Sequence, residues 1–388
     1  QFVSCLGLGA MVLRLLGLQK HRDSATRVAL AFAIGFGVLG WLMFFLGVAG
    51  LLSKGALLSL LILGASGLML FWDRATIIRF ESVNWLEWVL AAGIALALAF
   101  DLLEGLSPPA DGDSLAYHFD LPKRFLAAGK IEFVPRAVEG AVPLLVQMTY
   151  LPALGLGGEK AMTLWTMASG WGTAALLFFF SRPHMNRRWS LALTLIYLTT
   201  PAVVFGGGSG HVEVRLALFV LVAAFSIAET LRTGDLRYTI LAGLGAGFYM
   251  GAKYTGLLFA GVCGVVLCAL LLGAKGKWFR HGLILFLVTM AVGSQWYVWN
   301  WIHTGDPVFP ILFNLIEYRD PAVWNSAHHE LLGNYIEIYE RGTAINIWWF
   351  IAYPFVATFD GLKAFESGRI GLGLYPMLLL PFALLSLL

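Results

Sequence analysis

The sequence has 388 residues, of which 59% are hydrophobic and only 13% are charged. Soluble globular chains carry about 25% charged residues, so this composition excludes a water-soluble enzyme. The formal net charge of +3 is too small to indicate a nucleic-acid-binding protein. Apolar runs longer than the roughly 18 residues that cross a bilayer recur along the chain, which predicts an all-α, polytopic membrane protein.

Windows of about 19 residues predict a bundle of about twelve transmembrane helices. The predicted segments are 2–18, 28–52, 55–72, 85–104, 160–180, 189–205, 212–231, 238–252, 254–273, 282–302, 345–359 and 371–388. They define five regions, namely N-terminal helices over 1–104, a first polar loop over 105–158, core helices over 159–302, a second polar loop over 303–344 and C-terminal helices over 345–388.

The separation of two helices at Lys253 is the least distinct of these boundaries. The glycines before it allow close helix packing or a break in the helix. A single kinked helix there would invert the orientation of every later segment.

The distribution of charge predicts the orientation in the membrane. More than half of the 26 Lys and Arg residues lie in the short loops 19–27, 73–84, 181–188, 232–237, 274–281 and 360–370. Such loops favour the cytoplasmic side, so strict alternation places both long polar loops on the outer face. We expect function there, since loops on a rigid scaffold carry chemistry more often than the scaffold does.

The first polar loop has the pattern of an amphipathic helix. Polar residues at the spacing of one helical face are Asp113, Tyr117, Asp120 and Arg124, and the apolar side is formed by Leu115, Phe119, Pro122 and Leu126. We expect a helix at the membrane surface with a kink near Pro122, and a second amphipathic helix in 303–344.

Asp111 and Asp113 are the first candidates for chemistry. A carboxylate at the mouth of a membrane cavity is suited to general-base catalysis, because a reduced dielectric favours proton uptake. The pair also forms an Asp-x-Asp pattern, which in some enzymes ligates a divalent cation bound to a sugar phosphate. The alternative is a solvated turn that caps the next helix.

Ionisable residues inside predicted helices form a second group, because each is costly in a bilayer unless it is paired or faces a wet cavity. Glu213 and Arg215 begin one helix, and Lys253 lies at an outer boundary. The alternatives are that Lys253 snorkels to the interface and that Arg215 pairs with Glu213 or with lipid headgroups. Further acidic residues expected at the interface are Asp101, Glu104 and Glu229.

The remaining chemistry-bearing residues indicate no metal site. Cys5, Cys263 and Cys268 lie in apolar runs without ligand spacing, which predicts small core residues. His328 and His329 adjoin Glu330 but lack the spacing of known metal motifs. The start at Gln1 and the end inside an apolar run predict a processed or partial chain, without a signal peptide.

Four stretches carry a resemblance to a known family. They read DSLAYHFDLPKRFLAAGKI over 113–131, HVEVRLALF over 211–219, GAKYTGL over 251–257 and NWIHTGDPVFP over 300–310. Their order resembles that of bacterial integral-membrane glycosyltransferases of the C-type (GT-C) superfamily, related to protein O-mannosyltransferases and the lipid A aminoarabinose transferase. Glu213 and Asp306 stand where those proteins usually have Asp and Asn.

The resemblance implies transfer of a sugar from a polyprenyl-phosphate donor to an acceptor hydroxyl on the outer (periplasmic) face, with inversion at the anomeric carbon. It implies that Asp113 is the catalytic base and that cations lie beside the departing phosphate, where charge develops. The expected substrate-binding residues are Asp111, Tyr117, His118, Arg124, Glu213, Arg215 and Lys253. Lys253 and Arg215 are the first candidates for the cation, ahead of Arg124.

The implied partners are a lipid-linked sugar donor and membrane lipids, and the implied location is the bacterial cytoplasmic (inner) membrane. No residue is assigned as a metal ligand, although a divalent cation assisted by Asp111 is an open alternative. A second function class is a non-catalytic GT-C-like subunit of a larger membrane complex. A transporter would show an internal repeat with paired broken helices, and the sequence contains none.

Overall fold

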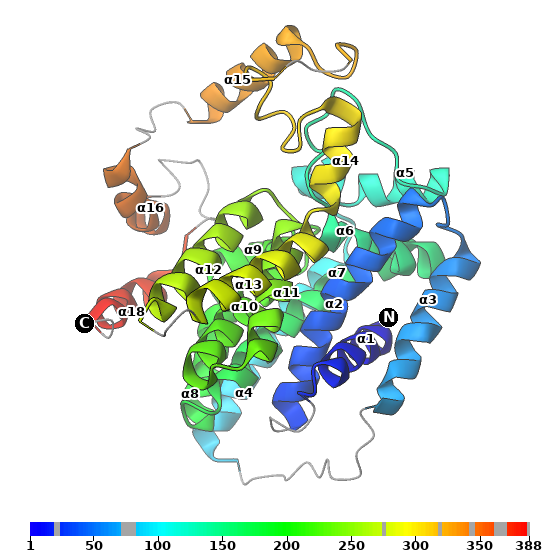
Figure 1. The fold of residues 1–388 in the computed structure, drawn as a ribbon. Coiled ribbons are helices and arrows are strands. Elements are labelled where there is room, and N and C mark those ends of the chain that lie inside the picture. The colour runs from blue at the N-terminus through cyan, green and yellow to red at the C-terminus, as the bar shows by residue number, and fades with distance from the viewer. Residues whose placement is uncertain are drawn as a thin grey trace.

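The computed structural model of the chain describes residues 1–18, 24–70, 83–273, 277–316, 320–340, 346–360 and 371–385. Within these ranges it consists of helices and connecting loops, without a strand (Figure 1). The helices are α1 (Phe2–Leu15), α2 (Ser24–Val48), α3 (Lys54–Ser66), η1 (Gly67–Leu70), α4 (Trp85–Leu106), η2 (Ser114–His118), α5 (Asp120–Ala128), α6 (Leu145–Met148), α7 (Tyr150–Ser181), α8 (Arg187–Leu198), α9 (Pro201–Gly207), α10 (Glu213–Thr233), α11 (Leu236–Met250), α12 (Thr255–Leu271), α13 (Lys277–Gly293), α14 (Gln295–Thr304), α15 (Ser326–Glu340), α16 (Ile347–Phe359) and α18 (Leu374–Leu385).

Several of these helices are long and apolar enough to cross a membrane. Four qualify singly, within α2, α4, α7 and α10, and the total in the described ranges rises to six if each of two bent pairs is one span. The pairs are α8 with α9, bent by 72°, and α13 with α14, bent by 59°. The described chain is therefore an all-helical, multi-pass membrane protein by composition. A helix lies in each predicted apolar segment, but length and composition qualify only these four to six as crossings.

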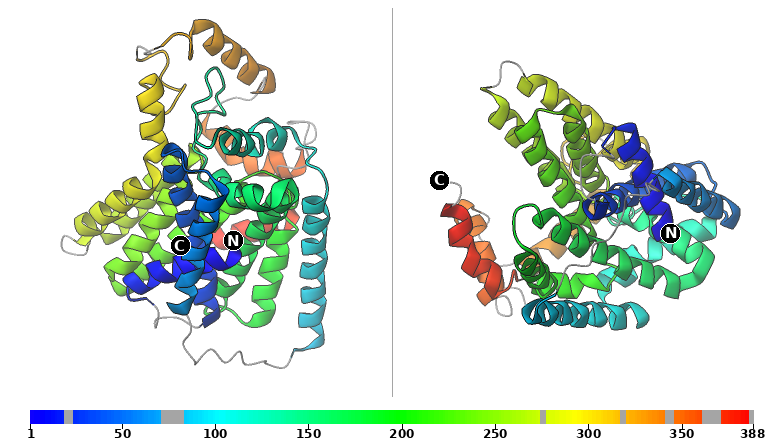
Figure 2. Two further views of the ribbon diagram at one scale, coloured as in Figure 1. Left: turned by 90° about the vertical axis from the view of Figure 1, so that its right-hand side faces the viewer. Right: turned by 90° about the horizontal axis from the view of Figure 1, so that it is seen from below.

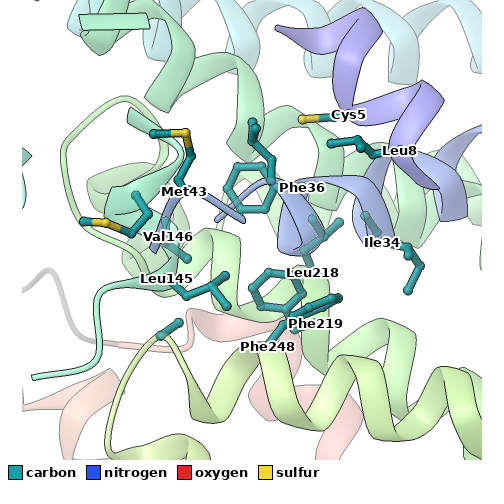
Figure 3. Packing of buried hydrophobic residues seen from close by; sticks show 14 of the residues in the cluster. Cys5, Leu8, Ile34, Phe36, Met43, Leu145, Val146, Leu218, Phe219 and Phe248 are labelled. Atoms are coloured by element: carbon teal, nitrogen blue, oxygen red, sulfur yellow. The ribbon is translucent and has the colours of Figure 1, made fainter. Parts of the chain in front are cut away.

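Helix α2 forms the centre of the main core. It packs against α1, α6, α7, α10 and α11, and its residues are apolar on all sides, which is typical of a buried helix. Figure 3 shows Phe36 of α2 among Leu218 and Phe219 of α10 and Phe248 of α11. The helices α1 and α2 cross closely at Gly35, which has no side chain. A side chain there would overlap the carbonyl group of Cys5.

The glycines of α11 bring three helices into close contact. A Cβ at Gly245 would lie 2.8 Å from the carbonyl oxygen of Phe219 in α10, and one at Gly247 would lie 2.8 Å from that of Thr289 in α13. The chain then leaves the helix after Met250 and starts α12 at Thr255. The predicted separation of two helices at Lys253 is confirmed.

The first polar loop differs from its prediction in two places. The expected continuous helix is interrupted at Phe119, between η2 and α5, and is not kinked at Pro122. Pro122 lies in the first turn of α5, where an N–H group would have no helical partner and its absence costs little. The predicted end of the loop at residue 158 coincides with a kink in α7, where Gly158 has φ 74°, and the helical residues 150–157 before the kink lie within the predicted loop.

Both polar loops lie at the same end of the helical body (Figures 1 and 2). This end holds α5, α6 and α14, with α15 beyond them. The helix α15 confirms that the second polar loop contains a helix. Much of the predicted basic loops, including Lys20, Arg74, Lys275 and Lys363, lies outside the described residues.

Candidate functional site

A glycine-rich segment, residues 206–210, joins α9 to α10 and lies against the end of α4. The N–H of Gly208 donates to the Glu104 carboxylate over 3.2 Å, and the N–H of Gly210 donates to Ser114 Oγ over 2.8 Å. A Cβ at Gly208 would lie 2.6 Å from Glu104 Oε2 and 2.8 Å from the Asp101 carbonyl oxygen. Only glycine therefore allows this segment to pack against both α4 and the first polar loop.

The two acidic residues at this end of α4 differ in burial. Asp101 is buried and accepts a hydrogen bond from Trp171 Nε1 over 3.2 Å, whereas Glu104 is exposed. The side chain of Asp101 is covered by α7 and the glycine-rich segment.

Arg215 is completely buried below the glycine-rich segment. Its guanidinium donates to the carbonyl oxygens of Gly206, Gly207 and His211, each over 2.7 Å, and to that of Thr166. The five N–H groups of this guanidinium therefore all have acceptors, which four carbonyl oxygens supply. The expected role beside a departing phosphate does not fit this geometry, and Arg215 instead holds the segment in place.

Asp111 accepts a hydrogen bond from the backbone N–H of Ser114 over 2.7 Å. This is the contact of a helix-capping residue, so Asp111 caps the helical turn at 112–113 that leads into η2, as the alternative interpretation of the Asp-x-Asp pattern expects; the N-cap residue of η2 itself, Asp113, has no capping bond from its side chain. The same oxygen, Oδ1, lies 3.4 Å from Nδ1 of His211.

His211 lies between the two aspartates. Its Nε2 is 3.7 Å from Oδ2 of Asp113, and its Nδ1 is 3.0 Å from Oγ of Ser209. Asp113 is the open member of the group, with 63% of its side-chain surface exposed. Sequence reasoning gave His211 no role. The available signal was its place directly after the glycine-rich segment and two residues before Glu213.

Tyr117 and His118 lie next to this group. Their ring centroids are 3.9 Å apart, and the His118 ring is 5.6 Å from that of His211. The His118 Nδ1 lies 2.9 Å from the amide nitrogen of Gln147, which donates to it. Burial lowers the pKa of His118 from 6.5 to about 3, so the ring is neutral. Burial, with a smaller contribution from Asp113, raises the pKa of Tyr117.

Glu213 and Lys253 form an ion pair between the start of α10 and the break between α11 and α12. Both side chains are partly exposed. The neighbouring Tyr254 donates to the carbonyl oxygen of Phe309 over 2.8 Å, and Asn300 donates to the Tyr254 hydroxyl over 2.9 Å. Tyr254 therefore ties the segment that carries Lys253 to the second polar loop.

Two predicted residues stand outside this group. Arg124 pairs with Asp120 over 2.6 Å on the exposed surface of α5. Asp306 is fully buried and accepts from the N–H groups of Val308 and Leu312 over 2.8 Å and 2.9 Å. The first is a surface pair and the second caps a turn.

Of two cavities, one adjoins the group. It has a volume of about 490 Å³, lies beside Asp111 and Glu104 and is also lined by Phe119 and Phe205. The other, of about 520 Å³, is an apolar groove between α12 and α13. Neither Lys253 nor Glu213 lines it. Among the described residues, no three His, Cys, Asp or Glu side chains are arranged to hold a metal ion.

The structure thus brings Asp111, Asp113 and His211 together and places Tyr117, His118 and the Glu213–Lys253 pair around them. We call these seven residues the outer cluster. No protein-family model, curated protein or solved structure matches this chain.

Proposed function

We propose that the chain is a membrane-embedded glycosyltransferase of the GT-C type, which moves a sugar from a polyprenyl-phosphate donor to an acceptor hydroxyl. The observation that carries the proposal is the outer cluster itself. An exposed carboxylate (Asp113), a histidine and a paired lysine come from three separate segments of the chain.

In the proposed reaction the acceptor oxygen attacks the anomeric carbon while Asp113 takes its proton. The bond between that carbon and the phosphate oxygen breaks, and the polyprenyl phosphate leaves with the electron pair from the opposite face. The Lys253 ammonium offsets the charge that develops on the phosphate. Glu213 holds the ammonium in place through their ion pair.

Two cavities support the proposed substrates. The apolar groove between α12 and α13 has the size and lining for an isoprenoid tail, and α12 follows in the chain directly after the segment with Lys253, where the phosphate would bind. The cavity beside Asp111 and Glu104 offers hydrogen-bond acceptors to the hydroxyls of a sugar. The tail would then lie among membrane-facing side chains and the sugar at the polar end.

The proposal includes the position in the membrane. The short helices α1, α3, α11, α12, α16 and α18 lie within the bilayer together with the four single spans and the two bent pairs, which gives the bundle of about twelve helices. The outer cluster faces the periplasm, and the protein resides in the bacterial cytoplasmic membrane.

The test is Asp113→Asn in membranes supplied with a radiolabelled polyprenyl-phosphate sugar. We expect transfer to fall by at least about 100-fold, the usual contribution of general-base catalysis, with unchanged membrane insertion. The matched control is Asp120→Asn, which alters a partly exposed carboxylate of the same loop. Full activity in Asp113→Asn would remove Asp113 as the base.

A second candidate is a non-catalytic subunit of a larger membrane complex. The observation that favours it is that protein groups already satisfy Arg215 and Asp111, as expected for a scaffold. Such a subunit would co-purify with a stable partner, and Asp113→Asn would leave the partner's activity unchanged.

A further inference from the structure

His211 is held in a defined orientation within the outer cluster. Its carbonyl oxygen accepts a hydrogen bond of 2.7 Å from Arg215, which is completely buried. Its ring lies next to those of Phe205 and His118, with centroid distances of 4.7 Å and 5.6 Å. Only 15% of its side-chain surface is exposed. The backbone contact and the two neighbouring rings therefore restrict the orientations that the imidazole can take.

The two nitrogens of this ring have different partners. Nδ1 lies 3.0 Å from Oγ of Ser209 and 3.4 Å from Oδ1 of Asp111. Nε2 lies 3.7 Å from Oδ2 of Asp113, the carboxylate that acts as the base in the proposed reaction. His211 therefore lies between the exposed carboxylate and the capping one.

The chemistry of these partners indicates which nitrogen carries the proton of a neutral ring. A general base must be ionised, and an ionised carboxylate only accepts hydrogen bonds, whereas a hydroxyl can donate or accept. Nε2, which faces Asp113, therefore needs the proton, and Nδ1 can accept from the Ser209 hydroxyl. Asp111 Oδ1 is farther from Nδ1 and already accepts from the N–H of Ser114.

The distance of 3.7 Å between Nε2 and Asp113 Oδ2 is longer than a hydrogen bond. Asp113 is largely exposed, so packing does not prevent its carboxylate from turning, and the last torsion of an aspartate side chain is soft. Hydrogen bonds of catalytic groups are often long before a substrate binds and shorten in the complex. An acceptor that displaces water from Asp113 leaves the N–H of His211 as a donor within reach.

We propose that His211 is a positioning residue, whose Nε2–H holds one oxygen of Asp113 and leaves the other directed at the acceptor hydroxyl. This inference rests on the proposed function, because it assigns a task beside the base of that reaction. Oδ1 of Asp113 takes the proton while Oδ2 keeps its hydrogen bond to the ring, and an oriented base reacts faster than a freely turning one. His211 acts through Asp113 and transfers no proton itself.

Two substitutions test which nitrogen matters, in the radiolabelled transfer assay. The amide nitrogen of glutamine can reach the place of Nε2, whereas the shorter asparagine reaches only the place of Nδ1. We expect His211→Asn to lower kcat between about tenfold and 100-fold, the range of one hydrogen bond to a charged group, with an unchanged KM for the donor. His211→Gln should recover most of this loss. His184→Asn is the control, since His184 is exposed in the turn between α7 and α8.

A double-mutant cycle separates positioning from a folding defect. In the Asp113→Asn background there is no base to orient, so His211→Asn should have little further effect on the residual transfer. A merely structural role of His211 would lower transfer by the same factor in both backgrounds. Equal losses in His211→Asn and His211→Gln, or the same factor in both backgrounds, would overturn the proposal.

Nitrogen NMR of the full chain with ¹⁵N-labelled histidine rings gives a readout that does not depend on transfer. The signals of His211 are those that disappear in His211→Asn. We expect wild-type protein to carry the proton on Nε2 and Asp113→Ala to shift the Nε2 signal. A proton on Nδ1, or an Nε2 signal unchanged in Asp113→Ala, would overturn the proposal. Absence of transfer in wild-type protein would overturn the proposed function and this role with it, and the NMR signals would still show whether the ring and the carboxylate are bonded.

Discussion

His118 is held neutral by burial, and this has consequences for acid stability. Its side chain is 1% exposed, and burial lowers its pKa from 6.5 to about 3. The unfolded chain takes up a proton below pH 6.5, whereas the folded chain does so only near pH 3. The folded state therefore loses stability as the pH falls through this window and keeps it above pH 6.5.

We expect His118→Asn to flatten this acid dependence. Asparagine retains an acceptor for the Gln147 amide but does not titrate. The thermal midpoint of the variant in detergent should fall less steeply than that of wild type between pH 6.5 and pH 4. The limiting difference is about 1.4 kcal/mol for each pH unit. Parallel curves for the two proteins would show that His118 is not the titrating group.

Asp111, Asp113 and His211 show which parts of the site are readable from a sequence. The two aspartates follow a predicted span and precede a predicted helix, so their place at the polar end follows from local pattern. The capping contact of Asp111 with Ser114 is also local. The position of His211 between them depends on how the glycine-rich segment packs on α4. This is a long-range contact, and no local pattern encodes it.

At the scale of elements, the glycine-rich segment couples α4 to α10. Its fit depends on the absence of side chains, because a Cβ at Gly208 would meet both the Glu104 side chain and the Asp101 backbone. The side chain can move aside, but the backbone oxygen cannot without a shift of α4.

We therefore expect Gly208→Ala to lower both the thermal midpoint and the transfer activity. Gly112→Ala is the matched control, because a Cβ there would have open space around it and the residue lies in the same region. Measurement of the two variants side by side separates a packing effect from a general effect of alanine. Equal stability of both would contradict the close contact.

The helices themselves were largely predictable, because an apolar run of sufficient length is a local property. The bends were not. The chain turns by 72° between α8 and α9 and by 59° between α13 and α14, where the sequence predicted single straight segments. Pro201 begins α9 and is a local signal for the first bend. The second bend, at Ser294, has no proline; its local signal is the weaker one of the Gly293–Ser294 pair.

At the scale of the whole molecule, the two polar loops lie at one end of the helical body. The basic segment 181–188, which joins α7 to α8, lies at the opposite end. This agrees with the alternation that the distribution of charge predicts. Which side faces the cytoplasm remains a prediction from the positive residues of the short loops.

Labelling of single cysteines by an impermeant maleimide in spheroplasts tests this orientation. In a Cys268→Ser background, we expect Glu132→Cys to be labelled in intact spheroplasts and His184→Cys only after permeabilisation, since both positions are exposed. The two remaining native cysteines are buried. The reverse pattern would place Asp113 on the cytoplasmic side and exclude a periplasmic acceptor.

The burial of Arg215 ties the order of synthesis to the order of assembly. Arg215 lies in the first turn of α10, where a charged residue hinders the insertion of a helix less than at its centre, but its burial still requires acceptors from other segments. Every carbonyl that receives its guanidinium belongs to Thr166, Gly206, Gly207 or His211. All four precede Arg215 in the chain, so they have left the ribosome before it does. The acceptors are thus already part of the chain when Arg215 is synthesised, and its guanidinium is paired as soon as α10 packs against α7 and α9.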